Sequence, residues 1–290
     1  MKEDLIALFI LLPSIVAVGY FVYVSIGWNV LVSFSNWKGL APNYNIVGFA
    51  NYAYIFSQQE FWVSLQNNLI LILLFVPSSI LLGLFLAVLL DNKVRGEGVF
   101  RTLYLLPFAL SFVITASLWS WMYNVRIGVV NTLLKQVGLG FLQLDWIGNP
   151  GIAMYSIILA LVWQFSGYTM LIFLAGIKSI PESQVMAAEV DGARGFSIYR
   201  RVIIPQLKSS VLATFVVLMV FALKAFDFIY ILTGGGPAGY STSVLPLYMF
   251  KETFARDHYA YGAAVASVLF VLVLIVAVPY LYFSFRRREA

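Results

Sequence analysis

The stretch SIPESQVMAAEVDGARGFSIYRRVIIPQL, residues 179–207, separates two long apolar runs and is the longest charged, amphipathic segment of the chain. Pro181 suits the first turn of a helix, where its missing N–H costs nothing. Ser179 and Glu182 have the S-x-x-E spacing of a capping box. Gly192 predicts the end of this short helix. A polar helical turn of this kind does not belong within a bilayer, so we expect it outside the membrane.

Composition places the chain among membrane proteins. Of its 290 residues, 61% are hydrophobic and 11% are charged, whereas soluble domains carry about 25% charged residues. The absence of cysteine excludes disulfides, thiol catalysis and cysteine metal sites, and the single histidine, His258, excludes a histidine-rich metal site. The net charge of +5 does not indicate nucleic-acid binding, because the positive charges lie in short loops beside apolar runs.

Six apolar runs are long enough to cross a bilayer, which takes about 20 residues each. They lie near 5–34, 66–90, 103–123, 152–177, 209–232 and 261–285. These runs do not alternate as barrel strands would. We therefore expect an all-α polytopic fold with six transmembrane helices, forming a single domain over residues 1–290. A second short helix is expected between the fourth and fifth spans, from about Phe196 toward Pro205.

The distribution of Lys and Arg predicts the orientation of these spans. With residues 179–207 in the cytoplasm, twelve of the 18 cationic residues lie inside, five lie outside, and Lys224 falls within the fifth span. This excess favours both termini inside. The inner set is Lys2, Lys93, Arg95, Arg101, Lys178, Arg194, Arg200, Arg201, Lys208, Arg286, Arg287 and Arg288.

The first outer loop is rich in aromatic side chains. Between residues 35 and 65 it carries Trp37, Phe49, Tyr52, Tyr54, Phe56, Phe61 and Trp62. Such rings suit the membrane–water interface. We expect an interfacial helix on the outer leaflet here.

The chain lacks the motifs of nucleotide binding. No G-x-x-x-x-G-K-[ST] loop is present. Uphill transport would therefore draw its energy from a partner that binds ATP and Mg²⁺ or from an ion gradient, and we expect no cofactor in this chain.

Several motifs together resemble a known family. Ala187-Ala188, Asp191-Gly192-Ala193 and, with nine residues between Gly192 and Val202, Val202-x-Ile204-Pro205 resemble the signature of the membrane subunits of binding-protein-dependent ABC importers, E-A-A-x-x-x-G followed nine residues later by I-x-L-P. Further matches resemble the carbohydrate-uptake branch: Gly48-Phe49-x-Asn51-Tyr52, Phe100-Arg101, Leu106-Pro107, Ala175-Gly176, Ile180-Pro181, Phe226-Asp227 and Thr233-x-Gly235-Gly236-Pro237. They extend from about residue 48 to 260. One position departs: Met186 stands where the family usually has Glu.

The resemblance implies a type I ABC permease core in which residues 181–192 form a coupling helix. Such a helix sits in a cleft of a separate ATP-hydrolysing subunit. Small residues allow close approach, and charged ones fix the orientation through hydrogen bonds. The residues expected to couple are Glu182, Ala187, Ala188, Glu189, Asp191, Gly192, Ala193 and Arg194. An ordinary solvated loop is the alternative interpretation.

Lys224 and Asp227 form a second candidate site, because charges at bilayer depth usually face a cavity or a partner. Their i, i+3 spacing places them on one helix face, which Tyr230 extends. The alternative is a structural ion pair. Additional polar candidates for a sugar path are Trp163, Gln164, Tyr168, Asn67 and Asn68, each of which could instead serve helix packing.

The sequence thus predicts a permease subunit of an ABC importer for a sugar or polyol, in a prokaryotic cell membrane. Its implied partners are a second homologous permease subunit, two ATP-binding subunits and an extracytoplasmic sugar-binding protein. Two alternatives stay open: an ion-coupled secondary transporter that uses Lys224 and Asp227, and an integral-membrane enzyme or scaffold. The sequence shows no cluster of residues with the spacing of a catalytic site.

Overall fold

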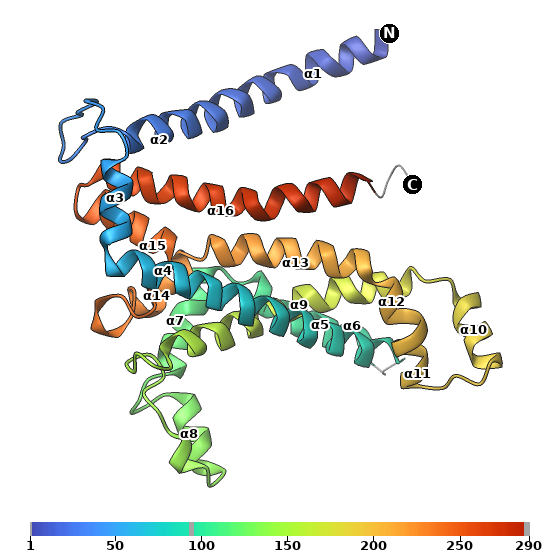
Figure 1. Cartoon of the computed structure of the whole chain (residues 1–290). Coiled ribbons are helices and arrows are strands. Elements are labelled where there is room, and N and C mark those ends of the chain that lie inside the picture. The colour runs from blue at the N-terminus through green and yellow to red at the C-terminus, as the bar shows by residue number, and fades with distance from the viewer. Residues whose placement is uncertain (1, 93–95, 287–290) are drawn as a thin grey trace. The chain divides into compact units, whose positions relative to one another are not determined.

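The computed structural model describes residues 2–92 and 96–286, and these residues are mostly helical (Figure 1). Within them, extended pairing is limited to an isolated antiparallel bridge between Ser35 and Ile46. The all-α expectation is therefore confirmed. Four cations used in the orientation count, Lys93, Arg95, Arg287 and Arg288, lie outside the described residues. Contacts divide the chain into two compact units.

The first unit comprises Met1–Trp62 and Leu245–Val276. Its elements are α1 (Lys2–Val18), the π-helical η1 (Gly19–Val24), α2 (Ser25–Ser33), α3 (Ala50–Ser57), the start of α4 (Gln59–Ile70), α15 (Leu245–Phe250), the π-helical η6 (Lys251–Ala255) and most of α16 (Tyr259–Arg286). The interfacial segment expected at 35–65 is helical from Ala50 to Ser57 and again from Gln59.

The second unit comprises Val63–Val244 and Ala277–Ala290. Besides the rest of α4 it holds η2 (π, Leu71–Phe75), α5 (Val76–Asp91), α6 (Glu97–Ala109), α7 (Phe112–Met122), α8 (Val129–Gln136), η3 (3-10, Gly140–Leu142), α9 (Ala153–Lys178), α10 (Glu182–Val190), α11 (Phe196–Ile198), η4 (π, Tyr199–Ile203), α12 (Ile204–Gln206), α13 (Lys208–Leu223), α14 (Asp227–Thr233) and η5 (3-10, Pro237–Gly239).

Four described helical runs are long and apolar enough to cross a membrane, and up to six cross if each of two bent helix pairs counts as one span. The four are Leu11–Ser33, Gln59–Asp91, Ala153–Lys178 and Tyr259–Pro279. The third predicted span is not one straight helix, because α6 and α7 meet at 97°. Pro107 inside α6 and the extended Leu110 that caps it account for this break.

Small residues let α5 and α6 pack tightly against α9. A side chain at Gly83 would collide with Thr169, and one at Gly167 would collide with the backbone carbonyl of Tyr104. The Thr169 hydroxyl lies 3.0 Å from the carbonyl oxygen of Ser79 and donates across the α5–α9 contact. Close backbone approach and interhelical hydrogen bonds of this kind hold helices together in lipid.

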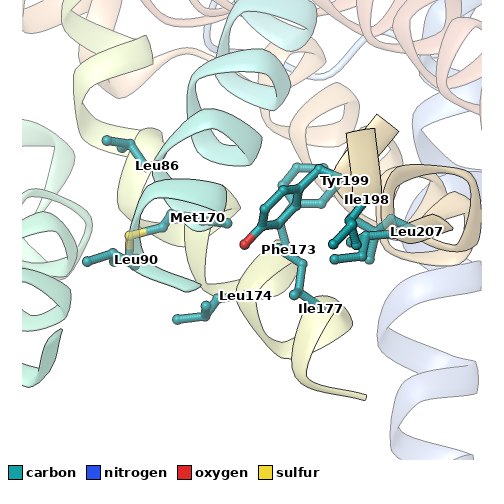
Figure 2. Packing of buried hydrophobic residues seen from close by; sticks show 11 residues of the cluster. Leu86, Leu90, Met170, Phe173, Leu174, Ile177, Ile198, Tyr199 and Leu207 are labelled. Carbon is teal, nitrogen blue, oxygen red and sulfur yellow. The ribbon is translucent and has the colours of Figure 1, made fainter. Parts of the chain in front are cut away.

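At the α10 end of the second unit, α5, α9 and the α11–α12 segment share one apolar cluster (Figure 2). It contains Leu86, Ala87, Leu90, Met170, Phe173, Leu174, Ile177, Ile198, Tyr199, Ile203 and Leu207. The predicted second helix is thus present as an unbroken helical run from Phe196 to Gln206, built from α11, η4 and α12.

Candidate functional site

The fifth apolar run is interrupted at its charged residues. Helix α13 ends at Leu223 with Lys224 as its C-cap, and α14 begins at Asp227. The expectation that Lys224 and Asp227 lie on one face of a continuous helix is therefore wrong. The break has a physical benefit, because both charged side chains stay exposed instead of entering a packed apolar interior. In the described part of the chain they form no ion pair with each other.

A cavity of about 260 Å³ opens at this break. Phe75, Phe112, Leu161, Phe165 and Phe221 give it apolar walls, and Lys224 and Asp227 give it charge. Its lining comes from η2, α7, α9, α13, the residues between α13 and α14, and the start of α14. The cavity therefore combines several aromatic surfaces with one cation and one anion.

A second hollow of about 320 Å³ shares Phe112, Phe221 and Asp227 with the first. Gln164 lines it from α9. The Gln164 amide nitrogen donates to the carbonyl of Leu110 over 3.3 Å, but its buried oxygen Oε1 has no hydrogen-bond partner among the described residues. Buried polar atoms are normally paired, so this oxygen is available to a ligand.

The other aromatic candidates are not among the residues that line these two hollows. Tyr168 stacks on Phe108, with ring centroids 4.9 Å apart, and Phe108 lines the second hollow. Trp163 packs edge-on against Trp119. Tyr230 stacks on Phe226 within the α13–α14 segment.

Asn67 and Asn68 are used in internal hydrogen bonds. The Asn67 amide nitrogen donates to the carbonyls of Ser241 and Ser243, over 2.9 and 2.8 Å. The Asn68 amide nitrogen donates to the carbonyl of Ala222 over 3.2 Å. Both side chains are buried and hold α4 against other parts of the second unit, so the structure favours the packing interpretation for them.

Helix α10 lies within the segment that carries the signature, but it begins differently from the expectation. Pro181 is its N-cap and Glu182 its first residue. The predicted capping box is absent, because the Ser179 hydroxyl donates to the carbonyl of Gly176 and so belongs to the end of α9. A serine at a helix end can hydrogen-bond either way, and here the preceding helix uses it.

The end of α10 is a Schellman motif at the predicted glycine. Gly192 has φ +85°, a conformation that favours glycine. The Ala193 N–H bonds to the carbonyl of Ala188, and the Gly192 N–H bonds to that of Glu189. These two bonds satisfy terminal carbonyls of the helix, so the stop predicted at Gly192 is confirmed.

Most coupling candidates on this segment are accessible. Glu182, Ala187, Glu189, Asp191, Gly192 and Arg194 are exposed, and Ala188 and Ala193 are half-buried. Met186 is 52% exposed and Val190 is 87% exposed. On the opposite side, Val185 and Ala193 pack against the apolar cluster, and Gln184 accepts a hydrogen bond from Gln206. Helix α10 therefore has one anchored side and one free, partly apolar side.

Sequence reasoning missed two charged clusters. In the second unit, the Asp91 carboxylate contacts both Lys178 and Tyr199. In the first unit, Glu60 and Glu252 bind Lys251, Arg256 and His258. No local spacing could have revealed Asp91–Tyr199 or Glu60–Arg256, because their partners lie more than 100 residues apart.

Comparisons with known proteins agree with this geometry. The family model described as the binding-protein-dependent transport system inner membrane component matches residues 70–289. A probable ABC transporter permease protein of Pyrococcus horikoshii is 57% identical over 279 residues, covering 96% of this chain and 95% of that protein. A xylose/arabinose import permease protein of Haloferax volcanii is 46% identical, covering 92% and 84%.

A solved structure has the same fold. It is a bacterial alginate ABC transporter in complex with an alginate pentasaccharide-bound periplasmic protein. The similar chain in it has a TM-score of 0.83 and 23% identity, covering 98% of this chain and 96% of that one. Membership in this family favours the ATP-driven importer over the ion-coupled alternative. The chain belongs to the binding-protein-dependent transport system inner membrane components and is a permease subunit of an ABC importer, not an enzyme in its own right.

Proposed function

We propose that this permease carries a sugar or related polyol, and that the two hollows at the α13–α14 break form part of the path. The observation that carries the proposal is that Lys224 lines the first hollow, Gln164 lines the second, and Asp227 lines both beside the shared rings of Phe112 and Phe221. The name of the Haloferax volcanii relative, a xylose/arabinose import permease, supports a sugar substrate.

The chemistry of the hollows suits a sugar. Sugars present apolar ring faces that stack on aromatic side chains and hydroxyls that donate and accept hydrogen bonds. Phe112 and Phe221 supply aromatic surface common to both hollows. Asp227 and the unpartnered oxygen of Gln164 accept hydrogen bonds, and Lys224 donates them. Ligand sites commonly hold about 300–1,000 Å³; the second hollow, at about 320 Å³, lies at the lower end of this range, and the first, at about 260 Å³, lies just below it.

We further propose that α10 is the coupling helix. Its free side would enter a cleft of an ATP-hydrolysing partner, with Glu182, Asp191 and Arg194 fixing its orientation and the small Ala187 and Gly192 allowing close approach. The exposure of this side supports the role. ATP and Mg²⁺ would be held by two such partners, and this chain would hold no cofactor.

The complete importer would contain a second, homologous permease subunit and an external sugar-binding protein, in the plasma membrane of a prokaryote. ATP-driven closure of the partners would move α10 and shift the permease between inward-facing and outward-facing states. Residues 35–65 would lie on the outer side of the membrane, with both termini inside, as the excess of Lys and Arg favours.

Uptake by the reconstituted complex tests the proposal. Vesicles that contain ATP and receive the external binding protein should take up at least one of radiolabelled D-xylose, L-arabinose, maltose and trehalose. Gln164→Leu removes the free acceptor and should raise the KM about three- to tenfold. The matched control is Gln136→Leu, which makes the same change at an exposed position of α8.

Two results would refute the proposal. One is uptake by the chain alone that needs no ATP and stops when an ion gradient is dissipated. The other is ATP-dependent transport that none of the four sugars drives or inhibits. A KM that rises equally in Gln164→Leu and Gln136→Leu would show that Gln164 has no specific role in the substrate path.

A further inference from the structure

The Asp91 carboxylate joins three helical segments of the second unit. Asp91 is the last residue of α5, and its Oδ1 lies 2.9 Å from Nζ of Lys178, the last residue of α9. Its Oδ2 accepts a hydrogen bond from the Tyr199 hydroxyl over 2.8 Å. The Asp91 side chain is 16% exposed. Both oxygens of one nearly buried carboxylate are thus used to hold different elements.

Tyr199 connects this carboxylate to the apolar cluster. Its side chain lies within the cluster formed with α5 and α9 (Figure 2). A tyrosine placed this way packs its ring among apolar groups while its hydroxyl needs a polar partner. Asp91 is that partner, so one side chain fixes the α11–α12 segment by packing and by a charge-assisted hydrogen bond.

Helix α10 rests on the same cluster. Ile180, Val185 and Ala193, from α10 and its two flanking loops, pack against it as partly buried side chains. The polar contact of Gln184 with Gln206 joins α10 to α12 over 2.9 Å. A displacement of α10 would therefore be passed to the α11–α12 segment. The hydrogen bond between Tyr199 and Asp91 anchors that segment to α5.

Two helices lead from this end of the unit to the cavity. Helix α9 runs without a break from Lys178 back to Phe165 and Leu161, which line the cavity. The distance from Lys178 to Phe165 along the helix is about 20 Å. Helix α13 starts two residues after α12 and ends at Leu223, next to Lys224. Of the elements that Asp91 ties together, α9 thus lines the cavity itself, and the α11–α12 segment leads into α13, which also lines it.

We infer that Asp91 is a positioning residue of energy coupling: by holding Lys178 and Tyr199 at once, it makes the α10–α12 segment, α5 and α9 move as one body. The inference rests on the proposed roles of α10 and of the cavity. We call the two contacts of Asp91, with Lys178 and with Tyr199, the Asp91 clamp. Without this clamp, ATP-driven movement of α10 would only slide the α11–α12 segment over the apolar cluster and would not reach α5 and α9.

Because the chain has no cysteine, a single introduced thiol can report on the cavity. Val220→Cys places it in the cavity wall. The full permease–ATPase complex is treated with a small thiol-specific reagent, with and without Mg-ATP, and labelling of this chain is followed with time. The background is then combined with Asp91→Asn, with Tyr199→Phe and with the control Glu97→Gln, a nearby carboxylate at the start of α6 whose charge acts on Lys178. ATP hydrolysis and co-purification are measured on the same samples.

We expect ATP to change the labelling rate about fivefold or more in the Val220→Cys background and in Glu97→Gln. In Tyr199→Phe and Asp91→Asn the change should fall to within about twofold, while hydrolysis and co-purification persist. Because Tyr199→Phe keeps the ring in the cluster, it decides the question even when Asp91→Asn fails to assemble.

An ATP response that persists in the assembled Tyr199→Phe complex would overturn the inference, even if that complex were less stable. A background that hydrolyses ATP but shows no change at Val220→Cys would instead overturn the proposed path, and the role of Asp91 with it. Failure of the inference alone is therefore distinguishable, because in that case the background and the variants respond equally.

Discussion

Lys224 and Asp227 stand on opposite sides of a helix break, the first as the C-cap of α13 and the second as the first residue of α14. Both line the same cavity, and both are exposed. In an uninterrupted helix, the i, i+3 spacing would have placed the two side chains on one face, where they could pair with each other. The break instead leaves each charge available to a bound molecule, in the way that discontinuous helices of transporters present polar groups near their substrates.

Asp227→Ala should weaken sugar uptake without dissociating the complex. A charge-assisted hydrogen bond contributes about 1.5–3 kcal/mol, so the KM for the transported sugar should rise about tenfold or more. Uptake kinetics in vesicles measure the change, and co-purification of the ATPase subunits measures assembly.

Glu97→Ala removes an acidic side chain from the first turn of α6 and serves as its control. It should leave the KM unchanged. An unchanged KM in Asp227→Ala as well would exclude Asp227 from the path.

The periodicity and length of the apolar runs were sufficient to predict the fourth span, which the structure gives as Ala153–Lys178. They could not predict the bend between α6 and α7 or the break between α13 and α14, because hydrophobicity measures whether a segment prefers lipid and not whether its backbone is continuous. At the third span the only local signal was Pro107, which terminates α6 two residues later.

Asn67→Leu should reduce stability and leave substrate affinity unchanged, in contrast to the changes at the cavity. Its amide donates to two backbone carbonyls, at Ser241 and Ser243. Leaving these buried acceptors without a donor should cost about 1–3 kcal/mol. Thermal unfolding in detergent measures the loss.

Asn45→Leu changes an exposed residue of the first unit and should not lower the unfolding temperature. If Asn67→Leu raised the KM and left the unfolding temperature unchanged, the packing role would be wrong and Asn67 would be assigned to the substrate path.

Gly192→Arg should prevent co-purification with the ATPase subunits. Gly192 has φ +85°, and a residue with a side chain pays about 1–2 kcal/mol for a left-handed conformation. The surrounding space is open, so the fold should survive. The end of α10 would loosen, and a long cation would stand on its free side.

Gly138→Arg is the matched control, since Gly138 has φ +81° and equally open surroundings at the end of α8. It carries the same strain and the same added charge at a site with no proposed docking role. Equal loss of co-purification in both variants would show that strain or charge, and not the position in α10, is responsible.

The candidate site divides in the same way as the fold. Local sequence patterns predicted α10 and its end at Gly192. The stop depends only on the backbone conformation of that glycine and not on distant contacts. The capping box failed because Ser179 had a competing acceptor at Gly176. The Asp91 clamp could not be predicted, because Lys178 and Tyr199 meet Asp91 only after α5 and α9 have packed. Tertiary contacts between distant residues have no periodicity to detect.

The charged cluster of the first unit gives a last prediction, concerning Glu252→Gln. The Glu252 carboxylate is buried and binds Arg256, while His258 lies 2.9 Å from its other oxygen. Arg256 also reaches Glu60 over 3.1 Å, and Lys251 reaches Glu60 over 3.2 Å. An amide at position 252 keeps the shape but removes the charge that balances Arg256.

Because Arg256 is 44% exposed, solvent screens part of this loss, and we expect a destabilisation of about 2 kcal/mol, below the 3–5 kcal/mol of a fully buried pair. Thermal unfolding should show it, with Glu97→Gln unaffected. Since the cluster lies wholly in the first unit, the labelling response at Val220→Cys in the second unit should stay intact in the folded Glu252→Gln complex. A Glu252→Gln complex of normal stability that had lost this response would instead assign the cluster a part in coupling.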